Sequence, residues 1–140
     1  MSLLLDTNVL SEVQRPVPSQ KVLGWLDAVD EDRVFISVAS IAELRRGIAL
    51  MDVGRRRAAL AAWIANDLPA RFAERILPID RAVAECWGDL MAQSRRSGVA
   101  LSVMDGFFAA TALARDLTLA TRNVRDLVSF GVPLFNPWDE

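Results

Sequence analysis

The chain has 140 residues, of which 52% are hydrophobic and 24% are charged, and its formal net charge is −2. This length and balance predict one domain over residues 1–140 with a substantial core, and they exclude wholesale disorder. There is no histidine, and Cys86 is the only cysteine, which excludes Ser-His-Asp and Cys-His catalysis, an intrachain disulfide and a His- or Cys-rich zinc site. Polar chemistry must therefore rest mainly on carboxylates, which favour hard cations such as Mg²⁺ or Mn²⁺.

The sequence also indicates where the protein works. Its apolar runs are much shorter than the ~18 residues that a membrane span needs, and no basic segment followed by an apolar core opens the chain. We therefore expect a cytoplasmic protein without membrane contact. Of the sixteen basic residues only Lys21 is lysine. Arginine is the better bidentate partner for phosphate, although a base-composition bias of the coding DNA explains the excess equally well.

Short apolar runs alternate with amphipathic segments along the chain. The runs predicted to be strands cover residues 3–5, 34–36, 75–79, 117–120 and 132–135. The segments predicted to be helices cover residues 7–15, 19–29, 37–51, 55–72, 80–96, 102–115 and 123–130. Pro78 favours an edge position for the third strand, and Pro69 disturbs the last turn of the helix over 55–72. The alternation predicts an α/β domain with a central parallel sheet of about four to five short strands flanked by helices.

Polar side chains follow several of the predicted strands. Asp6 comes directly after the first strand, Glu43 lies in the first turns of the helix after the second, and Asn123 follows the fourth. Asp105 lies in the first turn of an apolar helix. Because the carboxyl ends of parallel strands meet at one edge of a sheet, we expect these side chains to converge there.

Each acid also has a purely structural interpretation. Ser40 with Glu43 and Ser102 with Asp105 have the spacing of a helix capping box, and Asp6 could cap the first helix. Asp105, however, stands in a nearly wholly apolar stretch over residues 99–110. A charge there would be partly buried, and buried charges are almost always paired or bound to metal.

Four motifs stand in order along the chain: Leu-Leu-Asp-Thr-Asn-Val-Leu-Ser-Glu at 4–12, Ala-Glu-Leu-Arg-Arg-Gly at 42–47, Ser-Val-Met-Asp at 102–105 with Ala-Ala-Thr-Ala at 109–112, and Ala-Thr-Arg-Asn-Val-Arg-Asp-Leu at 120–127. Together they resemble the PIN-domain ribonucleases, in particular the VapC and FitB-like toxins of bacterial toxin–antitoxin pairs. The terminal Phe-Asn-Pro-Trp at 135–138 is similar to FitB-like chains. The likeness spans the whole chain in the right order.

The resemblance implies a PIN-like fold with an acidic pocket that binds Mg²⁺ or Mn²⁺. Asp6, Glu43 and Asp105 match the family's three main acids and are the expected catalytic residues. The fourth acidic position falls on Asn123, which can offer a neutral oxygen to a metal but adds no charge, so a second metal would be held less well. Asp126, one turn further on, is a candidate substitute, although a solvated or arginine-paired acid explains it as well.

The resemblance further implies metal-dependent hydrolysis of an RNA phosphodiester. Asp6 and Asp105 are the leading metal ligands, direct or through water, with Glu43 as a ligand or as the group that positions the attacking water. Arginines at the rim would hold the RNA backbone, although each is also explained as a surface charge. The supporting or substrate-binding candidates are Thr7, Ser102, Thr121, Arg46, Arg122 and Asp126, with Arg45 as a further arginine.

The partners implied are RNA, a cognate antitoxin that inserts into or covers the pocket, and a second copy of the chain in a homodimer. Four tryptophans in a small chain are compatible with such interfaces, and equally with a core. The four are Trp25, Trp63, Trp87 and Trp138.

Two other functions compete with this one. The run Asp6-Thr7-Asn8 is similar to the aspartyl-phosphate motif of haloacid-dehalogenase-like phosphatases, in which Asp6 would be a nucleophile. That chemistry usually needs a downstream lysine, and Lys21 is poorly placed for it. The other possibility is a PIN-like module that only binds a partner because Asn123 impairs its metal site.

Overall fold

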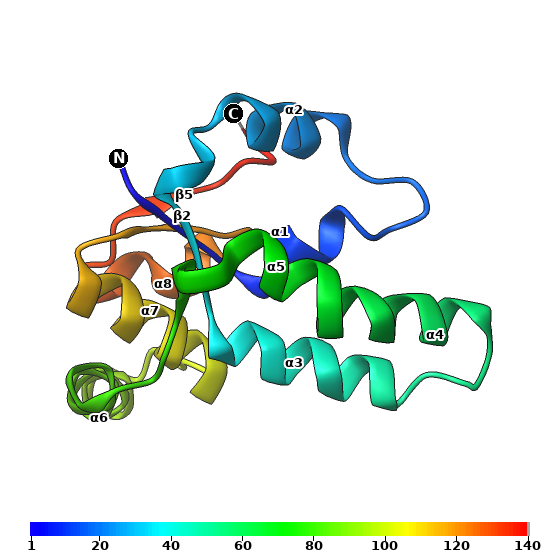
Figure 1. The fold of residues 1–140 in the computed structure, drawn as a ribbon. Helices are drawn as coiled ribbons and strands as arrows, with labels where there is room; N and C mark the ends of the chain where they lie inside the picture. The colour runs from blue at the N-terminus through cyan, green and yellow to red at the C-terminus, as the bar shows by residue number, and fades with distance from the viewer. Residues whose placement is uncertain (140) are drawn as a thin grey trace.

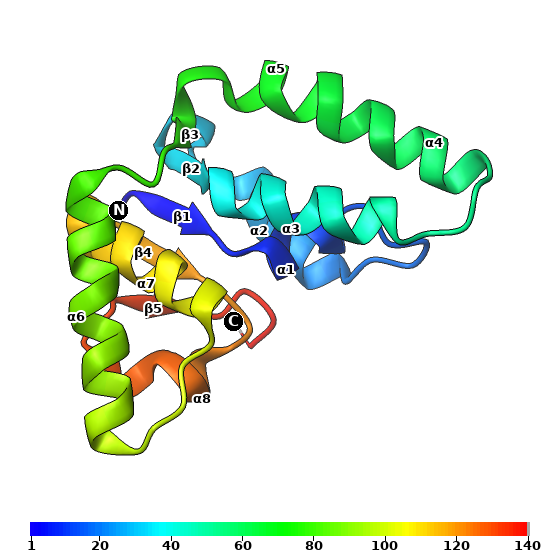
Figure 2. The ribbon, with the colours of Figure 1, turned by 90° about the horizontal axis from the view of Figure 1, so that it is seen from below.

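A computed structural model describes residues 1–139 of the chain. Its centre is a five-stranded sheet in the order β3-β2-β1-β4-β5, and every neighbouring pair of strands is parallel (Figures 1 and 2). The strands are β1 (Leu3–Leu5), β2 (Val34–Ser37), β3 (Ile76–Leu77), β4 (Thr118–Ala120) and β5 (Leu134–Phe135). The predicted α/β class with a parallel sheet is confirmed, and β3, which precedes Pro78, occupies an edge as expected.

Eight α-helices are described in residues 1–139. They are α1 (Thr7–Glu12), α2 (Gln20–Ala28), α3 (Val38–Ala49), α4 (Arg55–Ala62), α5 (Leu68–Phe72), α6 (Arg81–Ser97), α7 (Val103–Arg115) and α8 (Val124–Leu127). Ser19, Asp80 and Ser102 cap α2, α6 and α7 through their side chains. None of these helices is both long and apolar enough to cross a membrane.

The prediction of a single α-helix over residues 55–72 is wrong. After α4 the chain makes a π-helical turn over Trp63–Asp67, and α5 then begins with Pro69 in its first turn. A proline has no amide hydrogen and its ring displaces the carbonyl four residues before it, so a regular helix cannot continue through this position. The π turn keeps Ile64 and Leu68 buried while it absorbs that break.

Two other predicted helices are shorter than expected. The helix over residues 7–15 ends at Glu12, and the segment over 123–130 divides into α8 and a 3₁₀ turn over Val128–Phe130. The hairpin of α3 against α4 and the π turn extends away from the sheet (Figures 1 and 2).

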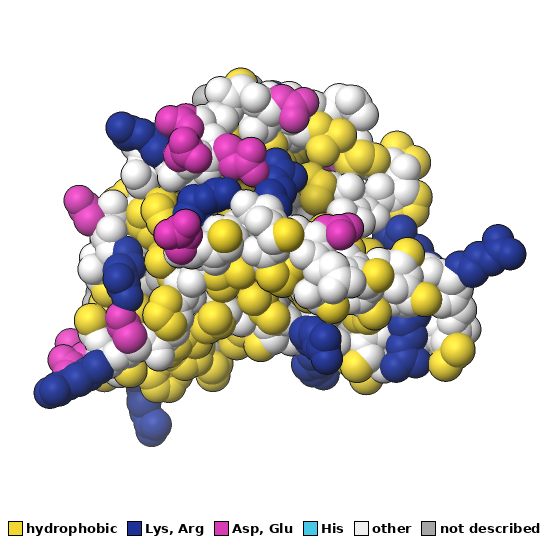
Figure 3. Space-filling view, in the orientation of Figure 1, with side chains coloured by type: hydrophobic (Ala, Val, Ile, Leu, Met, Phe, Trp, Pro, Cys, Tyr) yellow, Lys and Arg dark blue, Asp and Glu magenta, His cyan; other side chains and the backbone are white. Residues whose placement is uncertain are grey.

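The core forms two layers, one on each face of the sheet. Leu4 packs in the layer that contains residues of α6, α7 and α8, whereas Leu3 and Leu5 pack in the layer that contains residues of α1, α2 and α5. Successive side chains of a strand point to opposite faces, so a run of three leucines is what a central strand buried on both faces requires. The four tryptophans are partly buried against these two layers. In Figure 3 charged side chains of both signs are interspersed with apolar ones over the visible face.

Candidate active site

Asp6 and Thr121 lie side by side where the two central strands end. The Asp6 amide donates to the Ala120 carbonyl at 2.9 Å, which extends the pairing of β1 with β4 by one residue. The Thr121 hydroxyl then donates to Asp6 Oδ2 at 2.7 Å, and it accepts from the Asn123 amide at 3.0 Å. Both side chains are buried, with 4% of Asp6 and none of Thr121 exposed. Asp6 occupies the N-cap position of α1 without a capping side-chain bond, so capping does not account for its carboxylate.

Glu43 is held by α1 rather than by its own helix. The Thr7 hydroxyl donates to Glu43 Oε1 at 2.6 Å, and Thr7 Oγ1 lies 2.9 Å from Ser40 Oγ. Because a threonine hydroxyl has one proton and Glu43 receives it, the Ser40 hydroxyl is the donor in the second bond. The predicted capping box of Ser40 with Glu43 is therefore wrong: α3 begins at Val38, three residues before the start that a Ser40 cap requires, and Ser37 caps it by accepting from the Ala39 amide at 2.9 Å.

Asp105 lies in the first turn of α7. Its amide donates to Ser102 Oγ at 3.1 Å, so the capping role predicted for Ser102 is confirmed. Its half-buried carboxylate faces the same cavity as Asp6 and Glu43. Capping and a place in the cavity thus coexist in one residue.

The cavity has a volume of about 420 Å³, and all three predicted acids line it. Its lining residues are Asp6, Thr7, Asn8, Ser11, Glu12, Arg15, Glu43, Asp105, Arg122, Asn123 and Trp138. Thr121 and Ser102 do not line the cavity. Thr121 donates a hydrogen bond to the Asp6 carboxylate, and Ser102 caps the start of α7. Arg46 and Asp126 are exposed and lie outside the lining, although Asp126 is near enough to act on the charge of Asp105.

Five lining residues were not singled out from the sequence as site residues: Asn8, Ser11, Glu12, Arg15 and Trp138. A signal for four of them was present, because Asn8, Ser11 and Glu12 belong to the first motif and Trp138 to the terminal one. Arg15 had none beyond its place three residues after Glu12, where a helical turn brings two side chains together.

Burial and neighbouring charges raise the proton affinity of two of the acids, Asp6 and Asp105. Burial, assisted by the charges of Asp105 and Glu43, raises the pKa of Asp6 from 3.8 to about 6, against the opposing hydrogen bond from Thr121. Burial also raises the pKa of Asp105, and the charge of Asp126 acts in the same direction, whereas hydrogen bonds from Ser102 and Asn123 oppose it. The site therefore stores unfavourable negative charge that a divalent cation would relieve.

The donor set of the cavity fits a hard cation. Carboxylate, amide and hydroxyl oxygens line it, and the buried Asn8 Oδ1 has no hydrogen-bond partner in residues 1–139. Within that part of the chain no three acidic, histidine or cysteine side chains are close enough to hold one ion together. An ion would therefore take fewer carboxylates directly and keep several water ligands, which is how Mg²⁺ usually binds.

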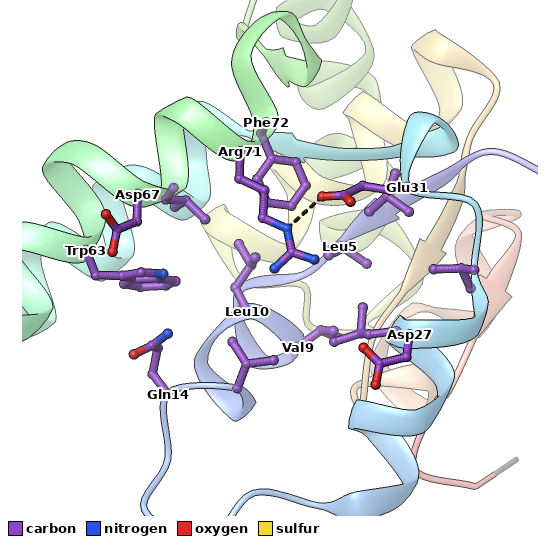
Figure 4. Close-up of a pocket in the computed structure, with 15 residues that line it drawn as sticks. Leu5, Val9, Leu10, Gln14, Asp27, Glu31, Trp63, Asp67, Arg71 and Phe72 are labelled. Carbon is purple, nitrogen blue, oxygen red and sulfur yellow. Dashed lines mark hydrogen bonds and ion pairs between the residues drawn. The ribbon is translucent and has the colours of Figure 1, made fainter.

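A second cavity of about 380 Å³ lies on the other side of α1 (Figure 4). Val9 and Leu10 line it, whereas Asn8 and Ser11 of the same helix line the acidic cavity. Its other walls come from α2, the π turn and α5, and the ion pair of Arg71 with Glu31 at 2.7 Å points into it. None of the three predicted acids lines this second cavity.

The chain is similar to several known proteins over nearly the full length of both sequences. It is 42% identical to the plasmid stability protein StbB of Pseudomonas syringae pv. tomato over 98% of this chain and 99% of that protein. It is 38% identical to the toxin FitB of Neisseria gonorrhoeae, with 99% of each chain covered. It is 36% identical to the VapC ribonuclease Y4jK of Sinorhizobium fredii, with 98% of each covered.

The fold agrees with these likenesses. The solved structure of FitAcB from Neisseria gonorrhoeae superposes with a TM-score of 0.92 at 38% identity, and 99% of both chains is covered. The family model of the PIN domain matches residues 3–129, a range that includes all three acids and Asn123. The chain therefore belongs to the PIN-domain family.

Proposed function

We propose that this protein is a metal-dependent endoribonuclease that serves as the toxin of a toxin–antitoxin pair. The observation that carries the proposal is the meeting of Asp6, Glu43 and Asp105 on one cavity at the carboxyl edge of a PIN-family sheet. The names of two relatives, a toxin and a ribonuclease, support the same function.

In this proposal Asp6 and Asp105 hold Mg²⁺ or Mn²⁺, directly or through water, and Asn123 adds a neutral oxygen. A bound divalent cation lowers the pKa of a coordinated water and polarises phosphoryl oxygens. Thr121 keeps Asp6 in one orientation and favours its ionised form through the 2.7 Å hydrogen bond.

Glu43 has a different environment from the other two acids. One of its oxygens is fixed by Thr7, which is in turn fixed by Ser40, so the carboxylate is oriented before substrate arrives. We assign it the task of positioning the water that attacks the phosphorus or of serving as a further metal ligand. A carboxylate held in this way loses little freedom when the reaction begins.

The partners proposed are RNA, a cognate antitoxin and a second copy of the chain. A nuclease that acts on the RNA of its own cell has to be restrained, and a protein that covers the acidic cavity would both block RNA and shield the carboxylates. Dissociation of such an antitoxin would free the cavity and restore nuclease activity. A sizing experiment across a wide concentration range tests the homodimer, and a monomer at every concentration would contradict it.

The test is RNA cleavage by the purified chain without any partner. We expect cleavage with Mg²⁺ or Mn²⁺, loss of cleavage in excess EDTA, and a loss of about 100-fold or more in Asp6→Asn and in Asp105→Asn. Asp52→Asn, an identical chemical change at an exposed position outside the cavity, is the matched control. Cleavage by Asp6→Asn at the wild-type rate would contradict the proposed site.

A further inference from the structure

The acidic cavity contains a fourth carboxylate, Glu12, which the proposed chemistry does not use. Glu12 is the last residue of α1 and is only 4% exposed. Its Oε2 accepts the Ser19 amide at 2.7 Å, and its Oε1 accepts from Arg15 at 3.3 Å. A buried carboxylate is costly unless it is paired and hydrogen-bonded, and here both conditions are met on the wall of the cavity.

Two guanidinium groups, those of Arg15 and Arg122, line the same cavity as this carboxylate. The Ser19 amide, followed by Arg15 and then Arg122, holds the pKa of Glu12 below its ordinary value. Arg122 also lies over the Trp138 ring, with its guanidinium carbon 4.8 Å from the ring centre. Each arginine is thus held from one side by a group of the cavity wall.

Both arginines keep donors available on their other side. The Arg15 side chain is 60% exposed, and Arg122 is likewise exposed. A guanidinium has five N–H donors, and Glu12 uses one nitrogen of Arg15. A pre-positioned guanidinium of this kind suits the bidentate recognition of a phosphate.

The negative charge of the cavity makes these two arginines relevant to RNA binding. Four of the lining residues are acids, and Arg15 and Arg122 are the cations among the described lining residues. An RNA strand that enters brings further negative charge, and a metal at Asp6 and Asp105 would compensate the scissile phosphate alone. The neighbouring phosphates need cations of the protein.

We infer that Arg15 and Arg122 bind a phosphate of the RNA backbone that flanks the scissile one, and that Glu12 is the positioning residue that holds Arg15 toward it. This subsite rests on the proposed ribonuclease function. It explains why a helix end in the site carries a buried glutamate paired to an exposed arginine. It also replaces Arg46, which the structure places outside the cavity, as the contact to the backbone.

The first experiment measures RNA affinity in EDTA, where no cleavage occurs, by fluorescence anisotropy of a single-stranded oligonucleotide. We expect Arg15→Ala and Arg122→Ala each to weaken binding about 10-fold and to reduce the slope of log Kd against log salt by about 0.7. Arg81→Ala is the matched control, because Arg81 is also an arginine paired with a glutamate, at 2.8 Å from Glu85, but lies on α6 outside the cavity. An effect of Arg81→Ala equal to that of Arg15→Ala would overturn the subsite.

The second experiment separates binding from chemistry by steady-state cleavage with Mg²⁺ or Mn²⁺. On an oligonucleotide the two variants should raise KM about 10-fold and change kcat by less than about 3-fold. On a dinucleotide, which has the scissile phosphate and no flanking one, the loss in kcat/KM should be at least about 5-fold smaller. Equal losses on both substrates would overturn the subsite, because the arginines would then act at the reacting phosphate or on the fold.

Glu12→Gln tests the positioning role, with Arg15→Lys as the conservative variant of its partner. Glu12→Gln removes the charge that holds Arg15, and we expect KM for the oligonucleotide to rise about 3-fold while kcat changes by less than about 3-fold. Arg15→Lys should recover part of the affinity that Arg15→Ala loses. A lower KM in Glu12→Gln would show that the glutamate only repels RNA and would refute its positioning role.

These outcomes are distinct from a failure of the ribonuclease proposal itself. A wild-type chain that cleaves no RNA with either metal contradicts the proposed function. A wild-type chain that cleaves RNA, while Arg15→Ala and Arg122→Ala bind and cleave it as the wild type does, contradicts only the phosphate subsite.

Discussion

Asp6 should destabilise the metal-free protein at neutral pH, and Asp6→Asn should relieve that cost. The pKa of Asp6 is about 6 in the folded chain against an ordinary value of 3.8. This difference corresponds to about 3 kcal/mol, because each pKa unit is 1.36 kcal/mol of differential interaction. Asp6 is 4% exposed, so solvent screens little of this energy. Asparagine keeps an oxygen that can accept from Thr121, and its new amide needs a partner, so we expect a net gain of about 1–3 kcal/mol.

The sign of the effect fixes its pH dependence. Well below pH 3.8 both folded and unfolded chains hold the Asp6 proton, and the stability deficit of the wild type should vanish. As the pH rises from about 4 to 6 the unfolded chain ionises first, so the wild type loses stability, and above about 6 the deficit is constant. Urea unfolding in EDTA at pH 4 and pH 8 measures this, with Asp52→Asn as the control.

Metal should reduce the stability deficit of the wild type relative to Asp6→Asn. At a Mg²⁺ or Mn²⁺ concentration of 100 times Kd, the wild type gains about 2.7 kcal/mol, and Asp6→Asn gains less. The reasoning would be refuted if Asp6→Asn were less stable than the wild type in EDTA at pH 8, or if their difference were the same at pH 4 and pH 8.

Further predictions concern the groups behind the site and the packing of α6 on α7. Thr121→Val removes the hydrogen bond to Asp6 Oδ2 and should raise the pKa of Asp6 further, which NMR titration of the Asp6 carboxyl carbon measures. The variant should also lose about 1–2 kcal/mol of stability in urea unfolding at pH 8. An unchanged pKa of Asp6 would contradict this prediction. Gly106→Ala should lower stability by about 1–3 kcal/mol in thermal unfolding, because its Cβ would lie 2.9 Å from Trp87 Nε1. Gly88→Ala, in the open face of α6, should instead add up to about 1 kcal/mol, and equal effects of the two glycine variants would contradict the packing described.

The sheet could be predicted because the central strand β1 is apolar at every residue and the edge strand β3 is followed by a proline. Leu3–Leu5 is apolar on every residue, which only a strand covered on both faces permits, and the structure buries all three leucines. The edge position of β3 followed from Pro78 and is observed. Alternation of such runs with helices leaves a parallel sheet as the simplest arrangement.

Helix ends and interruptions were harder to predict, since they depend on competition between nearby groups. Both Ser37 and Ser40 are of a residue type that caps helices, and in the structure Ser37 caps α3 whereas the Ser40 hydroxyl bonds Thr7. Pro69 signalled a disturbance, but the choice of a π turn before it reflects the need to bury Ile64 and Leu68, which is set by packing.

The candidate site shows the same division. The convergence of Asp6, Glu43 and Asp105 could be expected from their places after strands or in first helical turns, and all three line one cavity. The pairing of Glu12 with Arg15 could not be assigned to the site, because an i, i+3 pair is usually a solvated surface pair. Only the burial of Glu12 and its bond to the Ser19 amide distinguish it.

The most direct test of the central claim is sequencing of RNA ends from cells that express the wild type or Asp6→Asn without an antitoxin. Hydrolysis of phosphodiester bonds at the Asp6, Glu43 and Asp105 cavity predicts a discrete set of new RNA ends, together with growth arrest, in the wild type alone. The same new ends in cells that express Asp6→Asn, or no new ends in either, would contradict it.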